Sequence, residues 1–246
     1  MKVSVIIPSL NPDEKLICVV DSLREAGFDD IILVNDGSDE NHMEPFEHVS
    51  AYPECTILTH EVNKGKGRGL KTAFEYCIKN RPDIDGVVTV DGDNQHKAAD
   101  ILKCCEKMAE CKDKVVLGVR NFSGKDVPFK SRFGNNMTSF VFKFACGLNI
   151  SDTQTGLRAI PRQYLELFDK VKGERFEYET NMLLEFKQSH IDFVEVQIET
   201  VYIEENASTH FNPIKDSLKI YGVIFKFLFS SIASSVIDLA MFALIS

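Results

Sequence analysis

Short apolar runs alternate with amphipathic stretches along the first half of the chain. The runs, rich in β-branched residues, are Val3–Pro8, Ile31–Val34, Thr56–Thr59, Val87–Val90 and Lys114–Gly118. Between them, apolar residues recur at helical spacing over Asp13–Ala26, from Gly65 to about Lys79, and over Ala98–Cys111. Short strands that alternate with helices are typical of a parallel, doubly wound α/β sheet. The pattern predicts this fold, with Pro8, Asp36 and Asp91 at one edge of the sheet.

The alternation loosens after Arg120. The stretch Phe122–Asn136 is polar and basic and predicts a loop, and Met137–Cys146 is an apolar helix candidate. Phe176–Gln188 has helical spacing, whereas Ile191–Val201 alternates like an exposed strand. We therefore expect less regular structure in this part of the chain.

The last twenty residues, Phe227–Ser246, contain a single charged side chain, that of Asp238. An apolar stretch of this length is sufficient to span a hydrocarbon core, and the alternative is a buried globular helix. Lysines precede it, which places its N-terminal side in the cytosol. An amphipathic stretch that begins at Pro213 is predicted to lie in the membrane interface. The prediction is a globular domain over residues 1–205, a juxtamembrane segment over 206–226 and a transmembrane helix over 227–246.

The predicted membrane helix carries a polar stripe. Its members share one helical face, and they are Ser231, Ser234, Ser235 and Asp238. Polar side chains in lipid pair with partner helices. We therefore expect a homo-oligomer, or partner helices supplied by a longer parent protein.

Composition and charge narrow the class of protein. The formal net charge of −9 argues against general nucleic-acid binding. Two local clusters are basic, however: one spans Lys64–Lys71 and the other Lys112–Lys143, which favours small anions or an anionic membrane surface. The seven cysteines show no CxxC spacing, and the N-terminus does not resemble a signal peptide. We expect a cytosolic catalytic domain attached to the cell membrane.

The stretch Val87–His96 has the clearest chemical pattern. A β-branched strand ends in Asp91 and Asp93, followed at once by an amide and an imidazole. Two carboxylates at one strand end repel each other unless a cation lies between them, and Mg²⁺ or Mn²⁺ takes such ligands together with water and phosphates. The alternative is a polar surface turn. We interpret the pair as a metal site.

Two further strand ends carry polar residues. Asp36 follows the second strand, where acids in nucleotide-binding sheets contact a base or ribose. The loop Asn63–Gly69 combines glycines and cations with a helix start, which are the ingredients of a phosphate site. The loop is not a P-loop, because no Lys-Ser/Thr pair follows its last glycine. Together these features predict a nucleotide site at the sheet edge.

These motifs, in this order and spacing, resemble those of family 2 inverting glycosyltransferases with the GT-A fold. Residues 3 to about 200 are most similar to dolichol- and polyprenyl-phosphate sugar transferases. The six motifs that carry the resemblance are Ile7–Asn11, Val34–Ser38, Asn63–Gly67, Asp91–His96, Asp152–Arg158 and Phe176–Glu179. The resemblance implies a mostly parallel, Rossmann-like sheet.

The resemblance also implies roles for individual residues. Asp91, Asp93 and Gln95 would hold a divalent cation, Mg²⁺ or Mn²⁺. The residues implied to bind the nucleotide sugar are Pro8, Asn11, Asp36, Lys64, Lys66, Gly67 and Asp91. Those implied to bind the acceptor phosphate are Arg120, Arg132, Asn136 and Arg158. The implied catalytic residues are Asp91, Asp93, Arg120 and Arg132.

The chain departs from the family pattern in one place and extends it in another. Pro12 stands where many relatives have glutamate, so that Asp13 is the substitute candidate for the nucleoside contact. The segment Ser208–Pro213 and the helix after it are similar to the start of a GtrA-like membrane domain. The extension favours an acceptor in the membrane.

The resemblance implies transfer of a hexosyl group, with inversion, from a nucleoside-diphosphate sugar of the GDP-mannose or UDP-glucose type to a polyprenyl phosphate. The alternatives are a family 2 enzyme with a non-lipid saccharide acceptor, a sugar nucleotidyltransferase, and a pseudoenzyme that binds nucleotide sugars. A processive polysaccharide synthase is excluded, because its Gln-x-x-Arg-Trp motif needs a tryptophan and the chain has none. Glu177 and Glu179 point in different directions on a helix, and we expect at most one of them at the site.

Overall fold

The computed structural model describes residues 1–122, 129–199 and four single positions at 222, 225, 229 and 241. Its seven-stranded sheet has the order β3-β2-β1-β4-β6-β5-β7. The strands are β1 (Val3–Ser9), β2 (Ile31–Asn35), β3 (Cys55–Thr59), β4 (Gly86–Thr89), β5 (Val115–Arg120), β6 (Arg158–Pro161) and β7 (Phe193–Ile198). Only β6 runs antiparallel to its neighbours β4 and β5 in this sheet. The expected α/β fold with a mostly parallel sheet is confirmed.

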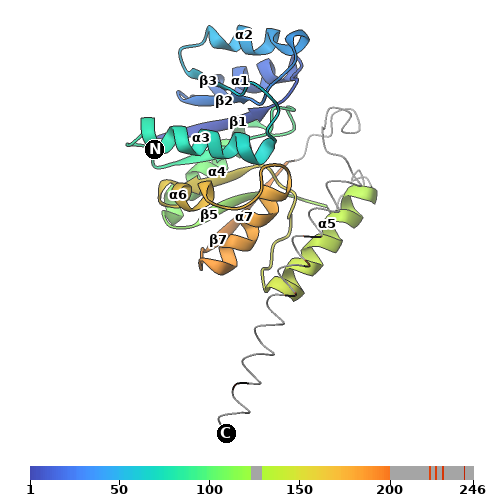
Figure 1. The fold of residues 1–246 in the computed structure, drawn as a ribbon. Helices are drawn as coiled ribbons and strands as arrows, with labels where there is room; N and C mark the ends of the chain where they lie inside the picture. Colours follow the sequence, from blue (N-terminus) through green and yellow to red (C-terminus); the bar gives the residue numbers. More distant parts are fainter. Residues whose placement is uncertain (123–128, 200–221, 223–224, 226–228, 230–240, 242–246) are drawn as a thin grey trace.

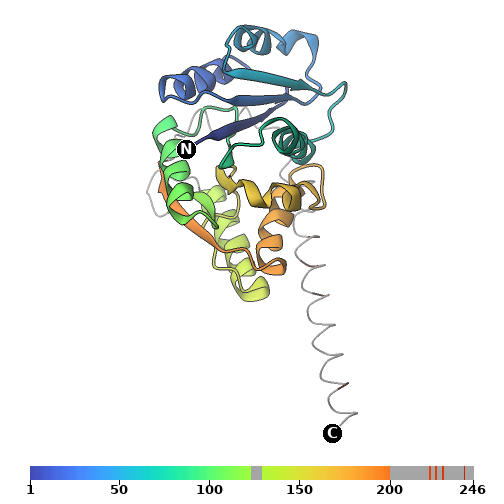
Figure 2. The ribbon, with the colours of Figure 1, turned by 90° about the vertical axis from the view of Figure 1, so that its left-hand side faces the viewer.

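Helices cover both faces of the sheet (Figures 1 and 2). One face packs against α1 (Lys15–Glu25), α2 (Glu44–Ser50) and α4 (Ala98–Cys111). The other face packs against α3 (Lys66–Asn80), α6 (Leu165–Asp169) and α7 (Glu177–Gln188). Two short 3-10 turns, η1 (Glu40–His42) and η3 (Arg162–Tyr164), complete these layers.

The apolar strands follow from burial on two sides. In β1, Ile6 packs into the core under α3, whereas Val5 and Ile7 pack into the core under α1. Because successive strand residues face opposite sides, a strand covered by helices on both faces is apolar throughout. The central strands therefore end abruptly where polar residues begin, and these ends form the site.

The middle of the chain differs from the expectation in two places. β6 was not predicted, because its four residues include a charged one and are held by pairing with β4 and β5 rather than by a local pattern. The second half of the predicted loop Phe122–Asn136 is helical, since α5 spans Phe129–Val141 and continues into a π-helical turn, η2 (Phe142–Cys146). Its apolar residues recur at helical spacing through the basic stretch.

The predicted segments at the C-terminus lie almost entirely outside the described residues. They include the boundaries at 205/206 and 226/227, the polar stripe and the membrane helix, and all of these stay predictions. Within the part of the chain that the structure describes, no helix is long and apolar enough to cross a bilayer. All seven cysteines are free thiols.

Candidate active site

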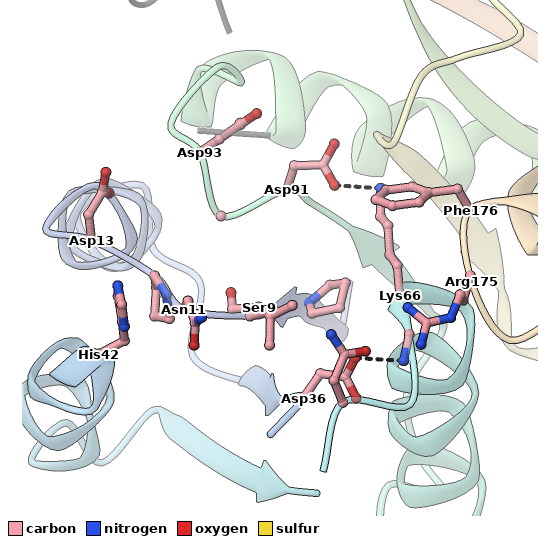
Figure 3. Close-up of a pocket in the computed structure, with 16 residues that line it drawn as sticks. Ser9, Asn11, Asp13, Asp36, His42, Lys66, Asp91, Asp93, Arg175 and Phe176 are labelled. Atoms are coloured by element: carbon pink, nitrogen blue, oxygen red, sulfur yellow. Dashed lines mark hydrogen bonds and ion pairs between the residues drawn. The ribbon is translucent and has the colours of Figure 1, made fainter. Parts of the chain in front are cut away.

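A cavity of about 480 Å³ opens at the C-terminal ends of β1, β2 and β4. Figure 3 shows an elongated site, with Asp13 and His42 at one end and Asp91, Lys66 and Phe176 at the other. Of the predicted site residues, the cavity wall contains Pro8, Asn11, Asp36, Lys66, Asp91 and Asp93. Parallel strand ends therefore bring together three motifs that are far apart in the sequence, as expected.

Asp91 is paired with a lysine. The Lys66 Nζ lies 2.7 Å from Asp91 Oδ1 and 3.0 Å from Glu179 Oε2. Burial alone would lower the pKa of Lys66, but the charges of Asp91 and Glu179 outweigh burial and raise it above its ordinary value. Burial likewise raises the pKa of Asp91, and the Lys66 ammonium more than offsets this, leaving it at about 2. Asp91 is therefore a carboxylate with its own counter-ion.

Asp93 lacks this compensation. Burial, followed by the negative charge of Asp91, raises the pKa of Asp93 to about 6. The Gln95 backbone N–H donates to Asp93 Oδ1 at 3.1 Å, which holds the carboxyl group in place. A carboxylate that is costly to ionise beside a second carboxylate is a place where an added cation is stabilised.

His96, three residues after Asp93, lies close to the Asp91 carboxylate. Its side chain is buried, and its Nε2 lies 4.0 Å from Asp91 Oδ2. Burial lowers the pKa of His96 despite the nearby charge of Asp91. This position suits an imidazole that supports the loop rather than one that transfers protons.

Both carboxylate oxygens of Asp36 accept hydrogen bonds. Its Oδ1 accepts from His60 Nδ1 at 2.7 Å and from the Lys64 N–H at 2.9 Å, and its Oδ2 accepts from the Gly65 N–H at 2.7 Å. The His60 Nε2 lies 3.0 Å from Thr72 Oγ1 on α3. Asp36 lines the cavity, and these bonds also make it the anchor of the loop Asn63–Gly69, called the glycine loop below.

The glycine loop packs closely on the segment before α7. A Cβ at Gly67 would overlap Tyr178, and one at Gly65 would overlap the backbone oxygen of Glu174. Gly67 is thus a packing residue, and the close approach explains how Glu179 reaches Lys66. The predicted cavity contact of Lys64 is not seen: its backbone bonds Asp36, while its side chain is exposed.

Asn11 connects the loop after β1 to the loop after β2 by hydrogen bonds. Its N–H donates to Ser38 Oγ at 2.8 Å, its Oδ1 accepts from the Asp39 N–H at 2.8 Å, and its Nδ2 donates to Asp39 Oδ2 at 3.1 Å. The residue adopts a left-handed backbone with φ of 48°. Asp13 also lines the cavity, and its carboxylate accepts from the Lys15 N–H at 2.9 Å.

Arg120 lies at the end of β5 and is oriented by Asp152. Its Nε and Nη2 donate to the two carboxylate oxygens of Asp152 at 2.8 and 3.1 Å. Asp152 is wholly buried, and the Phe122 ring lies 5.1 Å from the guanidinium. A forked ion pair with a buried partner holds the guanidinium in one direction.

Arg120 is not among the residues that line the cavity, and neither are the two other predicted acceptor residues whose side chains the structure describes, Asn136 and Arg158. Arg158 is 1% exposed and donates to the backbone oxygens of Thr155 and Glu179 at 3.2 and 3.1 Å, so it is placed in the core rather than on a binding surface. Asn136 is exposed on α5, whereas its neighbour Asn135 donates to the Ser151 oxygen at 2.7 Å. The side chain of Arg132 lies outside the described part of the structure.

The sequence alone left open which of two glutamates reaches the site. Glu179 contacts Lys66, whereas Glu177 accepts from the N–H groups of Glu174 and Arg175. His60 and Arg175 were not predicted from the sequence. His60 follows β3 just as Asp36 follows β2, and this strand-end position is a signal that could have found it. The contribution of Arg175 to the cavity wall has no comparable signal.

Comparison with known proteins identifies the chain. The family model described as Glycosyl transferase family 2 matches residues 4–168. The chain belongs to this family. It is a glycosyltransferase with the GT-A fold, and its sequence is similar to those of polyprenyl-phosphate sugar transferases.

Two relatives align with most of this chain. The UDP-N-acetylglucosamine–dolichyl-phosphate N-acetylglucosaminyltransferase of Methanococcus voltae is 30% identical over 220 residues, covering 81% of this chain and 85% of the relative. Glycosyltransferase AglJ of Haloferax volcanii is 25% identical over 226 residues, covering 91% and 69% respectively.

A solved structure shares the fold. Glucosyl-3-phosphoglycerate synthase from Mycobacterium tuberculosis, in complex with Mn²⁺, UDP and phosphoglyceric acid, aligns with a TM-score of 0.68 over 93% of this chain and 78% of that one. The two sequences are 14% identical, so the likeness concerns the architecture.

Proposed function

We propose that this protein transfers a hexosyl group, with inversion, from a nucleoside-diphosphate sugar to a polyprenyl phosphate at the cytosolic face of the cell membrane. The observation that carries the proposal is the arrangement of charge at one end of the cavity. There a compensated carboxylate, Asp91, lies beside an uncompensated one, Asp93, and the Lys66 ammonium shares the same wall. Such a wall suits a ligand that brings both a diphosphate and a divalent cation.

The donor set fits Mg²⁺ or Mn²⁺ bound together with substrate. Among the described residues, no group of three or more His, Cys, Asp or Glu side chains is arranged to hold a metal. Two carboxylates at one loop suit a cation that completes its shell with water and phosphate oxygens. Asp93 and Asp91 would hold it, with Gln95 beside them. When bound, the cation neutralises charge on the departing diphosphate.

Lys66 and the first turn of α3 would contact the leaving diphosphate. Lys66 is the first residue of that fifteen-residue helix, where backbone N–H groups and the helix dipole favour anions. The carboxylate of Asp36 fixes the N–H groups of Lys64 and Gly65 just before the helix. Positive charge is thus in place before the glycosidic bond breaks, which stabilises the transition state.

The acceptor needs orientation more than activation. A phosphate monoester has a second pKa near 6, so at neutral pH it is largely ionised and needs no strong general base. Arg120, held by Asp152, would orient it by charge-assisted hydrogen bonds, with Arg132 as the second cation. The anion then attacks the sugar from the face opposite the diphosphate.

A lipid acceptor suits the outer surface of α5 and η2. Met137, Phe140 and Phe144 lie there at helical spacing and are 42%, 58% and 72% exposed. The rings of Phe140 and Phe144 are 4.4 Å apart, centroid to centroid. Relatives named for dolichyl phosphate and undecaprenyl phosphate support the same acceptor class.

The test is a transfer assay with radiolabelled UDP- and GDP-sugars and vesicles that contain undecaprenyl or dolichyl phosphate. Vesicles with the unphosphorylated alcohol and soluble saccharides serve as parallel acceptors. We expect label in the phosphate-bearing lipid only, with Mn²⁺ or Mg²⁺ and not with EDTA. Transfer to the soluble saccharide alone would replace the proposed acceptor, and transfer that persists in EDTA would overturn the metal-assisted route.

A further inference from the structure

Two residues of the cavity wall each carry a buried polar side-chain atom that has no hydrogen-bond partner among the described residues. These atoms are Ser9 Oγ and His42 Nδ1. Buried polar groups in proteins are almost always paired, because an unpaired one costs about 1–3 kcal/mol. Two orphaned atoms on residues that line one cavity therefore indicate groups that a ligand completes.

The two residues lie in different parts of the cavity wall. Ser9 is the last residue of β1, and its Oγ is 2.9 Å from where a Cβ of Gly92, the residue between Asp91 and Asp93 in the sequence, would stand. His42 lies with Asp13 at the opposite end from Asp91 and Lys66 (Figure 3). If the diphosphate lies at Asp91, Asp93 and Lys66, the nucleoside extends toward His42.

The backbone of His42 is held in place by hydrogen bonds of the loop after β2. Its backbone N–H donates to the Asp39 oxygen at 2.9 Å, and Asp39 is in turn fixed by both ends of the Asn11 amide. The loop after β2 is thereby tied to the loop after β1. A side chain on a braced turn loses little freedom when it binds a ligand, which favours a recognition role.

We propose that His42 recognises the nucleobase of the donor through Nδ1, which makes it a specificity-determining residue. The inference rests on the proposed nucleoside-diphosphate donor. Neutral imidazole can donate or accept at Nδ1, according to its tautomer, and the edges of uracil and guanine offer both kinds of partner. Ser9 Oγ would complete the ribose–diphosphate end instead. The two orphaned groups thus serve separate parts of one ligand.

The experiment is calorimetric titration, with Mn²⁺ present, of UDP, GDP and ribose 5-diphosphate, which lacks a base. His42→Ala should weaken the tighter-binding nucleotide about tenfold, since a ligand hydrogen bond is lost, and leave ribose 5-diphosphate unchanged. Ser9→Ala should weaken all three ligands alike. His48→Ala is the matched control, because His48 pairs with Tyr52 on α2 and does not line the cavity.

Conservative variants separate recognition from folding. In His42→Asn the amide occupies the place of Nδ1 and should restore most of the affinity, whereas His42→Gln places its amide near Nε2 and should not. The proposal is overturned if His42→Ala binds UDP and GDP as wild type does, or if it loses ribose 5-diphosphate equally. Wild-type protein that binds no nucleoside diphosphate would instead overturn the proposed function itself.

Discussion

Asp36 and Asp91 each follow a buried parallel strand and precede a glycine, yet their surroundings are opposite. Asp36 is 3% exposed and accepts from two backbone N–H groups and an imidazole. Asp91 faces Lys66 and lies two residues from Asp93, whose carboxyl group has its pKa raised to about 6. The same local pattern therefore builds a hydrogen-bonded scaffold at one strand end and, in the proposed function, the cation-binding centre at the other.

The two carboxylates differ in what balances their negative charge. Both oxygens of Asp36 accept hydrogen bonds, from the His60 imidazole and from the N–H groups of Lys64 and Gly65. At the Asp91–Asp93 loop, Lys66 forms ion pairs with Asp91 and Glu179, and Asp93 has no such pair with this lysine. Removing charge should therefore destabilise the fold at Asp36 and abolish function at Asp93.

The largest effect is expected from Asp93→Asn. Loss of the cation-facing carboxylate should lower the transfer rate roughly 10³-fold. The unfolding free energy at neutral pH should rise by on the order of 1 kcal/mol, because the folded-state pKa of Asp93 lies above its ordinary value and ionising it costs stability. Rate assays and thermal unfolding measure the two effects, and an active variant would contradict the assignment.

Asp36→Asn should have the opposite profile. The amide keeps one acceptor but turns its NH₂ toward backbone donors, so that a drop of about 3 kcal/mol in unfolding free energy is expected. Denaturant unfolding measures this loss, with Asp13→Asn as the control, since the exposed Asp13 carboxylate bonds only locally. Equal stabilities for the two variants would refute the scaffold role.

Gly156→Ala tests whether the position of the Asp91 carboxylate matters for transfer. A Cβ at this position would overlap the Asp91 carboxylate, so that this carboxylate must shift from its place beside Lys66. We expect transfer to fall about tenfold to a hundredfold, as for other small displacements of catalytic groups. Gly134→Ala is the matched control, because the nearest atom to its Cβ is Gln154 Nε2 at 3.8 Å. Comparable loss in both variants would show that the effect is not specific to Asp91.

The mildest prediction concerns pH. The carboxyl group of Asp93 gains a proton as pH falls through about 6, whereas Asp91 stays ionised down to about pH 2. Protons then compete with the cation, and the Mn²⁺ affinity should fall up to tenfold per pH unit below 6 and level off above it. Isothermal titration over this range measures the slope; an affinity independent of pH would exclude Asp93 as a ligand.

Local pattern predicted the first five strands and the placement of Pro8, Asn11, Asp36 and Asp91 at one sheet edge. It succeeded because apolar runs and strand ends are encoded within a few neighbouring residues. It could not predict β6, which is held by pairing on both sides, nor the contact of Lys66 with Glu179, which depends on how α3 docks against α7. Charge compensation depends on tertiary contacts, and these contacts distinguish the hydrogen-bonded Asp36 from the uncompensated Asp93.

The most direct test is a Mn²⁺ titration in the presence of UDP, followed by electron paramagnetic resonance, on the wild type, Asp93→Asn and Asp36→Asn. The account predicts that Asp93→Asn loses UDP-dependent Mn²⁺ binding, while the folded fraction of Asp36→Asn retains it. Retention of Mn²⁺ by Asp93→Asn, with loss of Mn²⁺ by folded Asp36→Asn, would contradict the division between a scaffold and a reactive carboxylate.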